Sequence, residues 1–236
     1  MVEEIDWDQE ADRWTTWART PDHDAYWHYR DSFFDEIVPV AGRCTVEVGC
    51  GEGRVVRDLQ KRGHRVVAID RSRSLLRHAK EADPRGMYLL ANAARLPLAD
   101  ASCDLVIAYN SLMDVADLPT TVREASRVLE RGGRMCVCVT HPLSNAGKFL
   151  SDEPDAAFQI SESYFGRRKF EETFERDGHS ITFRGWSMAL EEYMRAFEGA
   201  GLLLEAMREP RVTDASDRFA PWRRLPMFLT LRLVKP

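Results

Sequence analysis

Long apolar runs and long basic runs are both missing from this chain. No uninterrupted apolar stretch reaches the roughly 18 residues that a membrane-spanning helix needs. Of the 236 residues, 44% are hydrophobic and 30% are charged, as is typical of water-soluble globular proteins. The formal net charge is −5, and no five consecutive basic residues occur. We therefore expect neither membrane nor nucleic acid as a partner.

Export signals and paired cysteines are also absent. The first residues, Met1 to Asp6, are acidic where a signal peptide is basic, and no apolar core follows them. The cysteine count is odd for a disulfide framework, and all five stand in or beside apolar runs: Cys44, Cys50, Cys103, Cys136 and Cys138. Reduced, buried thiols predict a cytoplasmic protein. No CxxC pair supplies the four ligands of a zinc site, so we expect no bound metal.

Short apolar segments alternate with amphipathic segments of helical length. Strands are predicted at residues 45–49, 65–70, 87–90, 103–109, 134–140, 202–207 and 227–234. Helices are predicted at residues 54–62, 72–82, 120–129 and 187–200, because each ends at a glycine or before a proline. This alternation predicts an α/β fold: a Rossmann-like, doubly wound and mostly parallel sheet of seven strands.

The segment VEVGCGEGR at residues 46–54 is a strand that breaks into a glycine-rich turn and opens a helix. Gly49, Gly51 and Gly53 allow a tight turn and the close approach of a ligand. Asp70 ends the next strand, 17 residues after Gly53, where a carboxylate can accept hydrogen bonds from both hydroxyls of a ribose. The spacing therefore predicts a cofactor that contains a nucleoside.

The residue after this turn distinguishes two kinds of cofactor. A dinucleotide-binding turn reads GxGxxG, with a small last residue where this chain has Arg54, so NAD is disfavoured. In this chain the acidic residue Glu47 is followed by GxGxG at Gly49 to Gly53. This pattern resembles motif I of the class I S-adenosylmethionine-dependent methyltransferases. Residues 96–104, 109–115 and 127–134 resemble later motifs of that family, in the family's order.

The resemblance implies S-adenosylmethionine as the cofactor. In this family, the acidic residue after strand 2 holds the ribose, and the loop after strand 3 holds the adenine. Here the loop reads Ala91-Asn92-Ala93 where a Gly-Asp-Ala sequence is usual. The side-chain oxygen of Asn92 can still accept a hydrogen bond from the adenine amino group. Glu47 either braces the glycine turn or reaches the cofactor's ammonium group. The implied cofactor-binding residues are Glu47, Gly49, Cys50, Gly51, Gly53, Asp70, Arg71, Asn92, Ala93, Tyr109, Asn110 and Ser111.

We expect one domain over residues 1–236, with four parts. Residues 1–40 form a helical N-terminal cap that holds four of the six tryptophans, and residues 41–140 form the cofactor-binding core. Residues 141–186 form an inserted substrate cover, with a small antiparallel hairpin that turns at Asp177-Gly178. Residues 187–236 supply the last helix and two strands.

The cap and the cover are expected to enclose the acceptor. Their aromatic side chains either pack the cap onto the sheet or line a pocket for a flat molecule. The candidate acceptor contacts are Trp17, Tyr26, Trp27, Asp114 and Tyr164. His141 directly follows strand 5 and is the candidate general base, since a histidine suits proton removal near neutral pH; alternatively it only shapes the loop with Pro142.

These observations predict a methyltransferase that moves a methyl group by in-line displacement to an oxygen or nitrogen of a small organic acceptor, for which an aromatic secondary metabolite is one candidate. The motifs of DNA amino- and cytosine-C5-methylating enzymes, Asx-Pro-Pro-aromatic and Pro-Cys, do not occur. Three alternatives stay open: a peptide or protein methyltransferase, an NAD(P)-dependent oxidoreductase, and a non-catalytic S-adenosylmethionine-binding protein. The expected assembly is a monomer or a homodimer.

Overall fold

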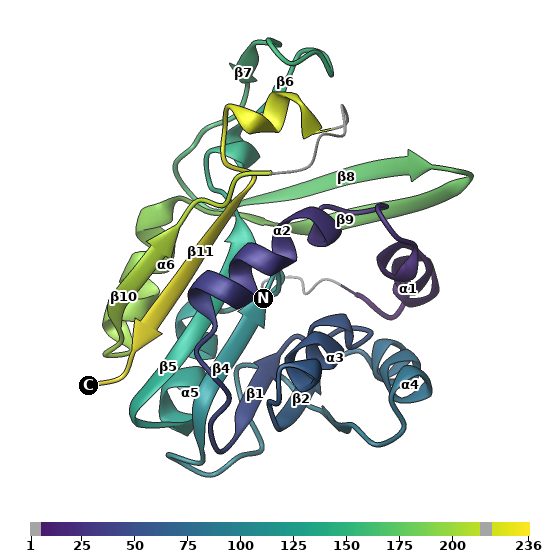
Figure 1. The fold of residues 1–236 in the computed structure, drawn as a ribbon. Helices are drawn as coiled ribbons and strands as arrows, with labels where there is room; N and C mark the ends of the chain where they lie inside the picture. The colour runs from purple at the N-terminus through teal and green to yellow at the C-terminus, as the bar shows by residue number, and fades with distance from the viewer. Residues whose placement is uncertain (1–5, 213–218) are drawn as a thin grey trace.

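The computed structural model describes residues 6–212 and 219–236, and a seven-stranded sheet forms its centre (Figure 1). The spatial order is β10-β11-β5-β4-β1-β2-β3. Strand β11 is antiparallel to both of its neighbours, and β1 to β5 run parallel. The strands are β1 (Thr45–Val48), β2 (Val66–Asp70), β3 (Met87–Leu90), β4 (Cys103–Tyr109), β5 (Leu129–Thr140), β10 (Leu203–Arg208) and β11 (Phe228–Val234). The predicted mostly parallel, seven-stranded α/β fold is confirmed.

Helices cover both faces of the sheet (Figure 1). They are α3 (Arg54–Lys61), α4 (Arg73–Ala82), α5 (Leu118–Val128) and α6 (Leu190–Gly199). Their starts follow the capping residues: Ser72 Oγ accepts from the Leu75 N–H at 3.1 Å, and Asp117 Oδ1 accepts from the Thr120 N–H at 3.0 Å. Strand β1 lies between β2 and β4, so the strand order reverses there. Ligands bind at the carboxyl ends of the strands beside such a reversal.

The N-terminal segment forms the predicted helical cap. Helix α1 (Ala11–Arg19), helix α2 (Tyr26–Ser32) and the π-helical turn η1 (Phe33–Ile37) follow one another along the chain. Buried side chains of α2 and η1, among them Tyr29 and Phe33, join the hydrophobic cluster on the α3 face of the sheet. Residues 1–5 of the predicted cap lie outside the described residues, as do residues 213–218 before β11.

Two small antiparallel sheets are inserted between β5 and α6. The larger is the hairpin of β8 (Arg168–Arg176) and β9 (His179–Ser187). It turns at Asp177 and Gly178, which both have positive φ, +48° and +77°, as the Asp-Gly sequence predicted. The smaller pairs β6 (Gly147–Phe149) with β7 (Phe158–Ile160), which the sequence analysis did not anticipate. Among the described residues, none of the helices combines the length and apolar character that crossing a bilayer requires.

Candidate active site

A cavity of about 1530 Å³ lies at the carboxyl ends of the parallel strands. The last residue of β2 and of β5, and the residue directly after β1, β3 and β4, line it: Asp70, Thr140, Gly49, Ala91 and Asn110. Its remaining walls come from the N-terminal segment, the loop after β4, the β6–β7 segment, the β8–β9 hairpin and the segment before β11. Figure 1 shows α1 and the hairpin beside each other above this edge of the sheet. The fold therefore encloses the space in which the strand order predicts ligand binding.

The glycine turn is the floor of this cavity and ties three strands together. Gly49 has φ +76°, and a β-carbon there would lie 2.4 Å from Ser111 Cβ, so only glycine fits. Ser111 Oγ donates to the Val48 carbonyl oxygen at 2.6 Å, which joins the end of β4 to the end of β1. The Gly51 N–H donates to Asp70 Oδ2 at 2.7 Å, which joins the turn to the end of β2.

Two buried carboxylates stand beside the turn. Asp70 Oδ1 accepts from the Ser72 N–H at 2.8 Å, but burial outweighs its backbone donors and raises the pKa of Asp70. Glu47 is only 1% exposed, and its Oε2 atom has no hydrogen-bond partner among the described residues. Burial, together with the nearby carboxylates of Asp70 and Glu52, raises the pKa of Glu47 well above its usual value. A bound cationic group would relieve the cost of this unpaired oxygen.

The structure brings together eleven of the twelve residues expected to bind the cofactor. They line the large cavity and are Glu47, Gly49, Cys50, Gly51, Asp70, Arg71, Asn92, Ala93, Tyr109, Asn110 and Ser111. Gly53 does not line it: this glycine, with φ +83°, begins α3, and a β-carbon there would lie 3.0 Å from Tyr88 Oη. Asn92 is exposed, and its Oδ1 accepts from the Ala94 N–H at 2.8 Å, as in an ordinary turn.

Three of the expected acceptor contacts line the cavity. Trp17 is buried, and its indole N–H has no partner within the described residues. Asp114 accepts a hydrogen bond from the Trp7 side chain, while burial raises the pKa of Asp114 well above its usual value. The ring of Tyr26 lines the cavity, but its hydroxyl points to α3 and donates to Asp58 Oδ2 at 2.7 Å.

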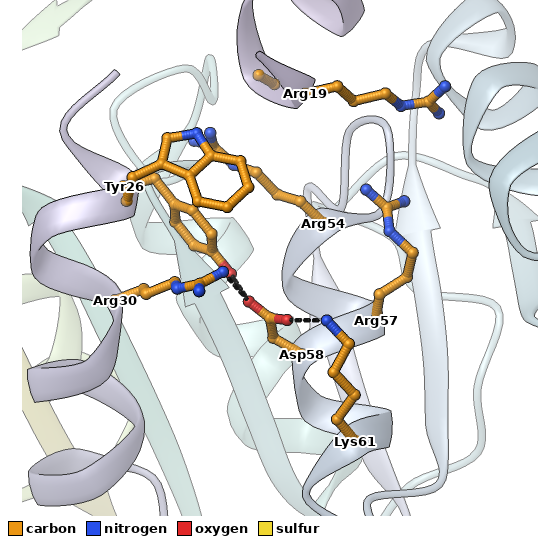
Figure 2. Close-up of a pocket in the computed structure, with 9 residues that line it drawn as sticks. Arg19, Tyr26, Arg30, Arg54, Arg57, Asp58 and Lys61 are labelled. Atoms are coloured by element: carbon orange, nitrogen blue, oxygen red, sulfur yellow. Dashed lines mark hydrogen bonds and ion pairs between the residues drawn. The ribbon is translucent and has the colours of Figure 1, made fainter. Parts of the chain in front are cut away.

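Two other expected acceptor contacts lie elsewhere. Trp27 lines a separate pocket of about 290 Å³ between α2 and α3, together with the basic side chains of Arg19, Arg30, Arg54, Arg57 and Lys61 (Figure 2). Tyr164 Oη accepts from the Leu190 N–H at 3.2 Å, at the start of α6. Neither is among the residues that line the large cavity.

The candidate base, His141, also lies outside the cavity lining. Its Nδ1 accepts from the Leu143 N–H at 3.1 Å, and its Nε2 lies 3.1 Å from Glu209 Oε1. Burial lowers the pKa of His141, while Glu209 opposes this shift. The ring nitrogens therefore have one partner in the loop after β5, Leu143, and one directly after β10, Glu209, the arrangement expected of a loop-shaping histidine.

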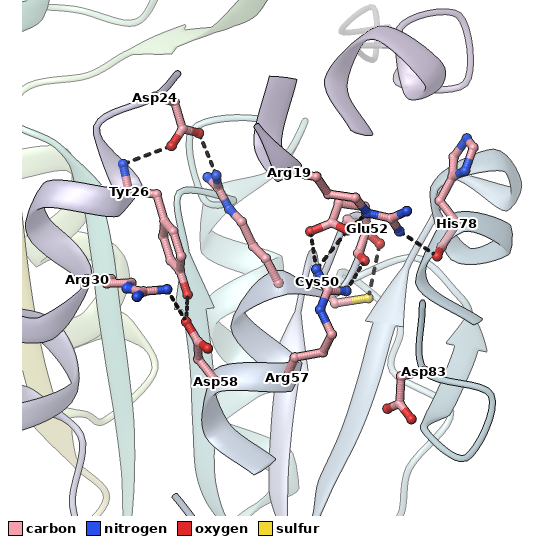
Figure 3. Close-up of polar contacts among 12 residues, drawn as sticks. Arg19, Asp24, Tyr26, Arg30, Cys50, Glu52, Arg57, Asp58, His78 and Asp83 are labelled. Carbon is pink, nitrogen blue, oxygen red and sulfur yellow. Dashed lines mark hydrogen bonds and ion pairs between the residues drawn. The ribbon is translucent and has the colours of Figure 1, made fainter. Parts of the chain in front are cut away.

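Arg54 connects the N-terminal segment to the glycine turn. Its Nη1 donates to Asp24 Oδ2 at 2.5 Å, and its guanidinium lies 4.2 Å from the Tyr26 ring centroid. Beside it, Arg19 Nε donates to Glu52 Oε2 at 2.7 Å (Figure 3). The arginine that made the turn a poor match to a dinucleotide site thus holds the segment before α2 over the cavity.

The sequence analysis missed the residues that the hairpin contributes to the cavity. Every second residue of β8 from Phe170 to Arg176 lines it, namely Phe170, Glu172, Phe174 and Arg176; Glu171 lines it as well, and Phe183 and Arg184 join them from β9. This period of two is the signal that could have identified the alternating residues once the hairpin was predicted. In the described part of the chain, no group of three or more His, Cys, Asp or Glu side chains could hold a metal ion.

Comparisons with known proteins identify methyltransferases among the relatives of this chain. Residues 46–137 match the family model described as a methyltransferase domain. A probable S-adenosylmethionine-dependent methyltransferase of Mycobacterium tuberculosis is 33% identical over 121 residues, which are 49% of this chain and 43% of that protein. The demethylmenaquinone methyltransferase of Tropheryma whipplei is 27% identical over 202 residues, covering 78% of this chain and 82% of that protein. The chain thus spans less than half of the M. tuberculosis relative.

Solved structures show the same fold. An S-adenosylmethionine-dependent methyltransferase from Mesorhizobium loti matches with a TM-score of 0.70 and 23% identity, over 90% of this chain and 99% of that chain. At this identity the likeness concerns the fold alone. The segment matched by the family model runs from β1 into β5 and so contains the glycine turn and Asp70.

Proposed function

We propose that this chain, a member of the class I S-adenosylmethionine-dependent methyltransferases, transfers a methyl group to an oxygen or nitrogen of a small organic acceptor. The observation that carries the acceptor class is the size of the cavity. Sites for one small molecule are typically about 300–1000 Å³, whereas this one measures about 1530 Å³. It has room for a cofactor and a small acceptor together.

The residues on the floor of the cavity fit the family's cofactor. Asp70 stands where it would hold the ribose, and the loop at Asn92 where it would hold the adenine. The unpaired Oε2 of Glu47 is suited to an ammonium group. When bound, S-adenosylmethionine supplies a methyl group on a positively charged sulfur. The protein's own contribution is to orient the acceptor beside that group and to exclude water.

The walls of the cavity favour a small acceptor over a peptide. The N-terminal segment crosses above the glycine turn, held by the Arg54–Asp24 ion pair, and the β8–β9 hairpin covers the adjacent space. A peptide acceptor would need an open groove there. The T. whipplei relative is named for demethylmenaquinone, an organic acceptor, which supports the same class.

Proton removal is needed only for some acceptors. His141 is proposed for this role from its position after β5, but its ring would first have to leave Leu143 and Glu209. We further propose a cytoplasmic protein of one domain, monomeric or homodimeric. The five free thiols support a reducing compartment.

Calorimetric titration with S-adenosylhomocysteine tests the cofactor, with NAD as the parallel control. We expect micromolar binding of S-adenosylhomocysteine, on the order of −8 kcal/mol, and no binding of NAD. Binding of NAD alone would support the oxidoreductase alternative instead. The acceptor class is then tested by mass spectrometry of small phenols, amines and peptides incubated with enzyme and S-adenosylmethionine. Methylation confined to the peptides would refute the small-molecule proposal.

A further inference from the structure

The hairpin presents two carboxylates to the cavity, Glu171 and Glu172, and Glu172 stands among aromatic rings. Phe170, Glu172 and Phe174 alternate along β8 and all line the cavity, because every second residue of a strand points to the same face. In the hairpin register, Glu172 is opposite Phe183 of β9, which also lines the cavity. Glu172 is thus flanked by phenylalanines along its own strand and across to the next.

Phe174 and Phe183 belong to a longer row of rings, which we call the aromatic wall and define as Trp7, Trp14, Phe183 and Phe174. The ring centroids of Trp7 and Trp14 lie 6.0 Å apart, those of Trp14 and Phe183 5.7 Å, and those of Phe183 and Phe174 5.6 Å. The wall joins the N-terminal segment to the hairpin. Aromatic faces attract cations, so the wall and Glu172 favour the same kind of ligand.

The carboxylate of Glu172 has no hydrogen bond or ion pair with any described residue. The neighbouring Glu171, in contrast, accepts from Arg184 Nε at 3.0 Å. Glu172 is solvent-exposed where it lines the cavity; desolvation by the neighbouring residues raises the pKa of Glu172, and Lys148 on β6 opposes this shift. A cationic ligand bound in the cavity would supply the partner that this carboxylate does not receive from the described residues.

The other charges at this end of the cavity leave it negative. Lys148 is the one basic side chain from the β6–β7 segment that lines the cavity, whereas Asp152 and Glu153 come from the same segment. Glu171 and Glu172 of β8 add two acidic groups, and Arg176 of β8 and Arg184 of β9 add two basic ones, so four negative groups and three positive ones line this end of the cavity. Arg176 also lines the cavity, but its guanidinium lies 5.4 Å from the Trp17 ring centroid and donates to the His23 carbonyl oxygen.

We propose that Glu172 selects a methyl acceptor that carries a protonated amine on an apolar or aromatic body. The amine would pair with the Glu172 carboxylate, and the body of the molecule would lie against the aromatic wall. This inference rests on the proposed function, because it concerns the acceptor half of the same cavity. Glu172 is a specificity-determining residue in this view, and the amine need not be the atom that receives the methyl group.

Two probes of equal size test the inference. The protein is titrated with 2-phenylethylamine, which is protonated at pH 7, and with 2-phenylethanol, which is neutral. Each titration is made with and without saturating S-adenosylhomocysteine and is followed by calorimetry. We expect the amine to bind at least tenfold more tightly than the alcohol. Glu172→Gln should reduce this ratio to about threefold or less and leave S-adenosylhomocysteine affinity unchanged.

Glu175→Gln is the matched control. Glu175 lies on the same strand, is exposed and does not line the cavity, so this variant should keep the full preference for the amine. Equal affinity for the two probes in the parent protein would overturn the inference. So would a preference that survives in Glu172→Gln, or an amine that does not bind at millimolar concentration. Absence of S-adenosylhomocysteine binding would refute the proposed function separately, because the cofactor-free titrations still compare the probes.

Discussion

Replacing Gly49 by alanine tests how the ends of β1 and β4 form the cavity floor. Gly49 has φ +76°, a conformation that costs an L-residue about 1–2 kcal/mol. The added β-carbon would also lie 2.4 Å from Ser111 Cβ and 3.0 Å from its Oγ. Ser111 cannot move away freely, because its Oγ donates to the Val48 carbonyl oxygen at 2.6 Å.

The two costs of Gly49→Ala should add. Overpacking of this kind destabilises by about 1–3 kcal/mol, so we expect the free energy of unfolding to fall by about 3 kcal/mol in total. Gly132→Ala is the matched control: Gly132 has φ +77°, but no atom lies within 4 Å of the position of its β-carbon. This variant should lower the free energy of unfolding only by the cost of the positive φ angle, about 1–2 kcal/mol.

Urea unfolding of four proteins separates the contact from the conformation. The parent, Gly49→Ala, Ser111→Gly and the double variant form a cycle in which Ser111→Gly removes the clashing β-carbon. We expect a favourable coupling of about 1–3 kcal/mol between the two substitutions. Additive effects, or a Gly49→Ala cost no larger than that of Gly132→Ala, would refute the reasoning. Calorimetry should also show that Gly49→Ala binds S-adenosylhomocysteine more weakly than Gly132→Ala does.

Three further predictions concern single side chains. Asp70→Asn should weaken S-adenosylhomocysteine binding at least tenfold, because hydrogen bonds to a charged group contribute about 1.5–3 kcal/mol. Calorimetry measures the change in affinity, and a change under twofold would contradict this prediction. Hydrogen bonds from Arg134, followed by those from Arg232, lower the pKa of Glu205 to about 2 from its usual 4.5. The stabilisation by these ion pairs is therefore present above pH 4.5 and is lost as the pH falls to 2. Glu205→Gln should lower the free energy of unfolding by about 1 kcal/mol or less at pH 7, and urea unfolding should show that this difference vanishes near pH 2. A difference that stays constant with pH would exclude the ion pairs as its source. If His141 acts as the base, His141→Ala lowers the methylation rate of a phenolic or amine acceptor about 100-fold with unchanged cofactor affinity; a loss under threefold would leave it the loop-shaping role.

The regular elements followed from local patterns. The predicted strands and helices of the α/β core agree with the structure to within a few residues, because hydrophobic period and glycine or proline stops act over one element. The largest difference is β5, which begins at Leu129 and not at residue 134. Leu129 pairs with Cys103 before an irregularity in the β4–β5 register, so Gly132 and Gly133 lie inside the strand. The β6–β7 pair was missed, because three-residue strands carry too little periodicity.

The sequence by itself determined the glycine turn, the acidic residue that ends β2 and the family to which they point. These features depend on backbone conformation and spacing within one βαβ unit. Tertiary structure alone decided which side chains meet above the glycine turn. Trp17 lines the cavity, Trp27 does not, and Glu172 lines the cavity together with the aromatic wall. The physical reason is that the walls pack together segments more than 150 residues apart, such as His23 and Arg176. No local pattern specifies the register between such segments, because long-range packing sets it.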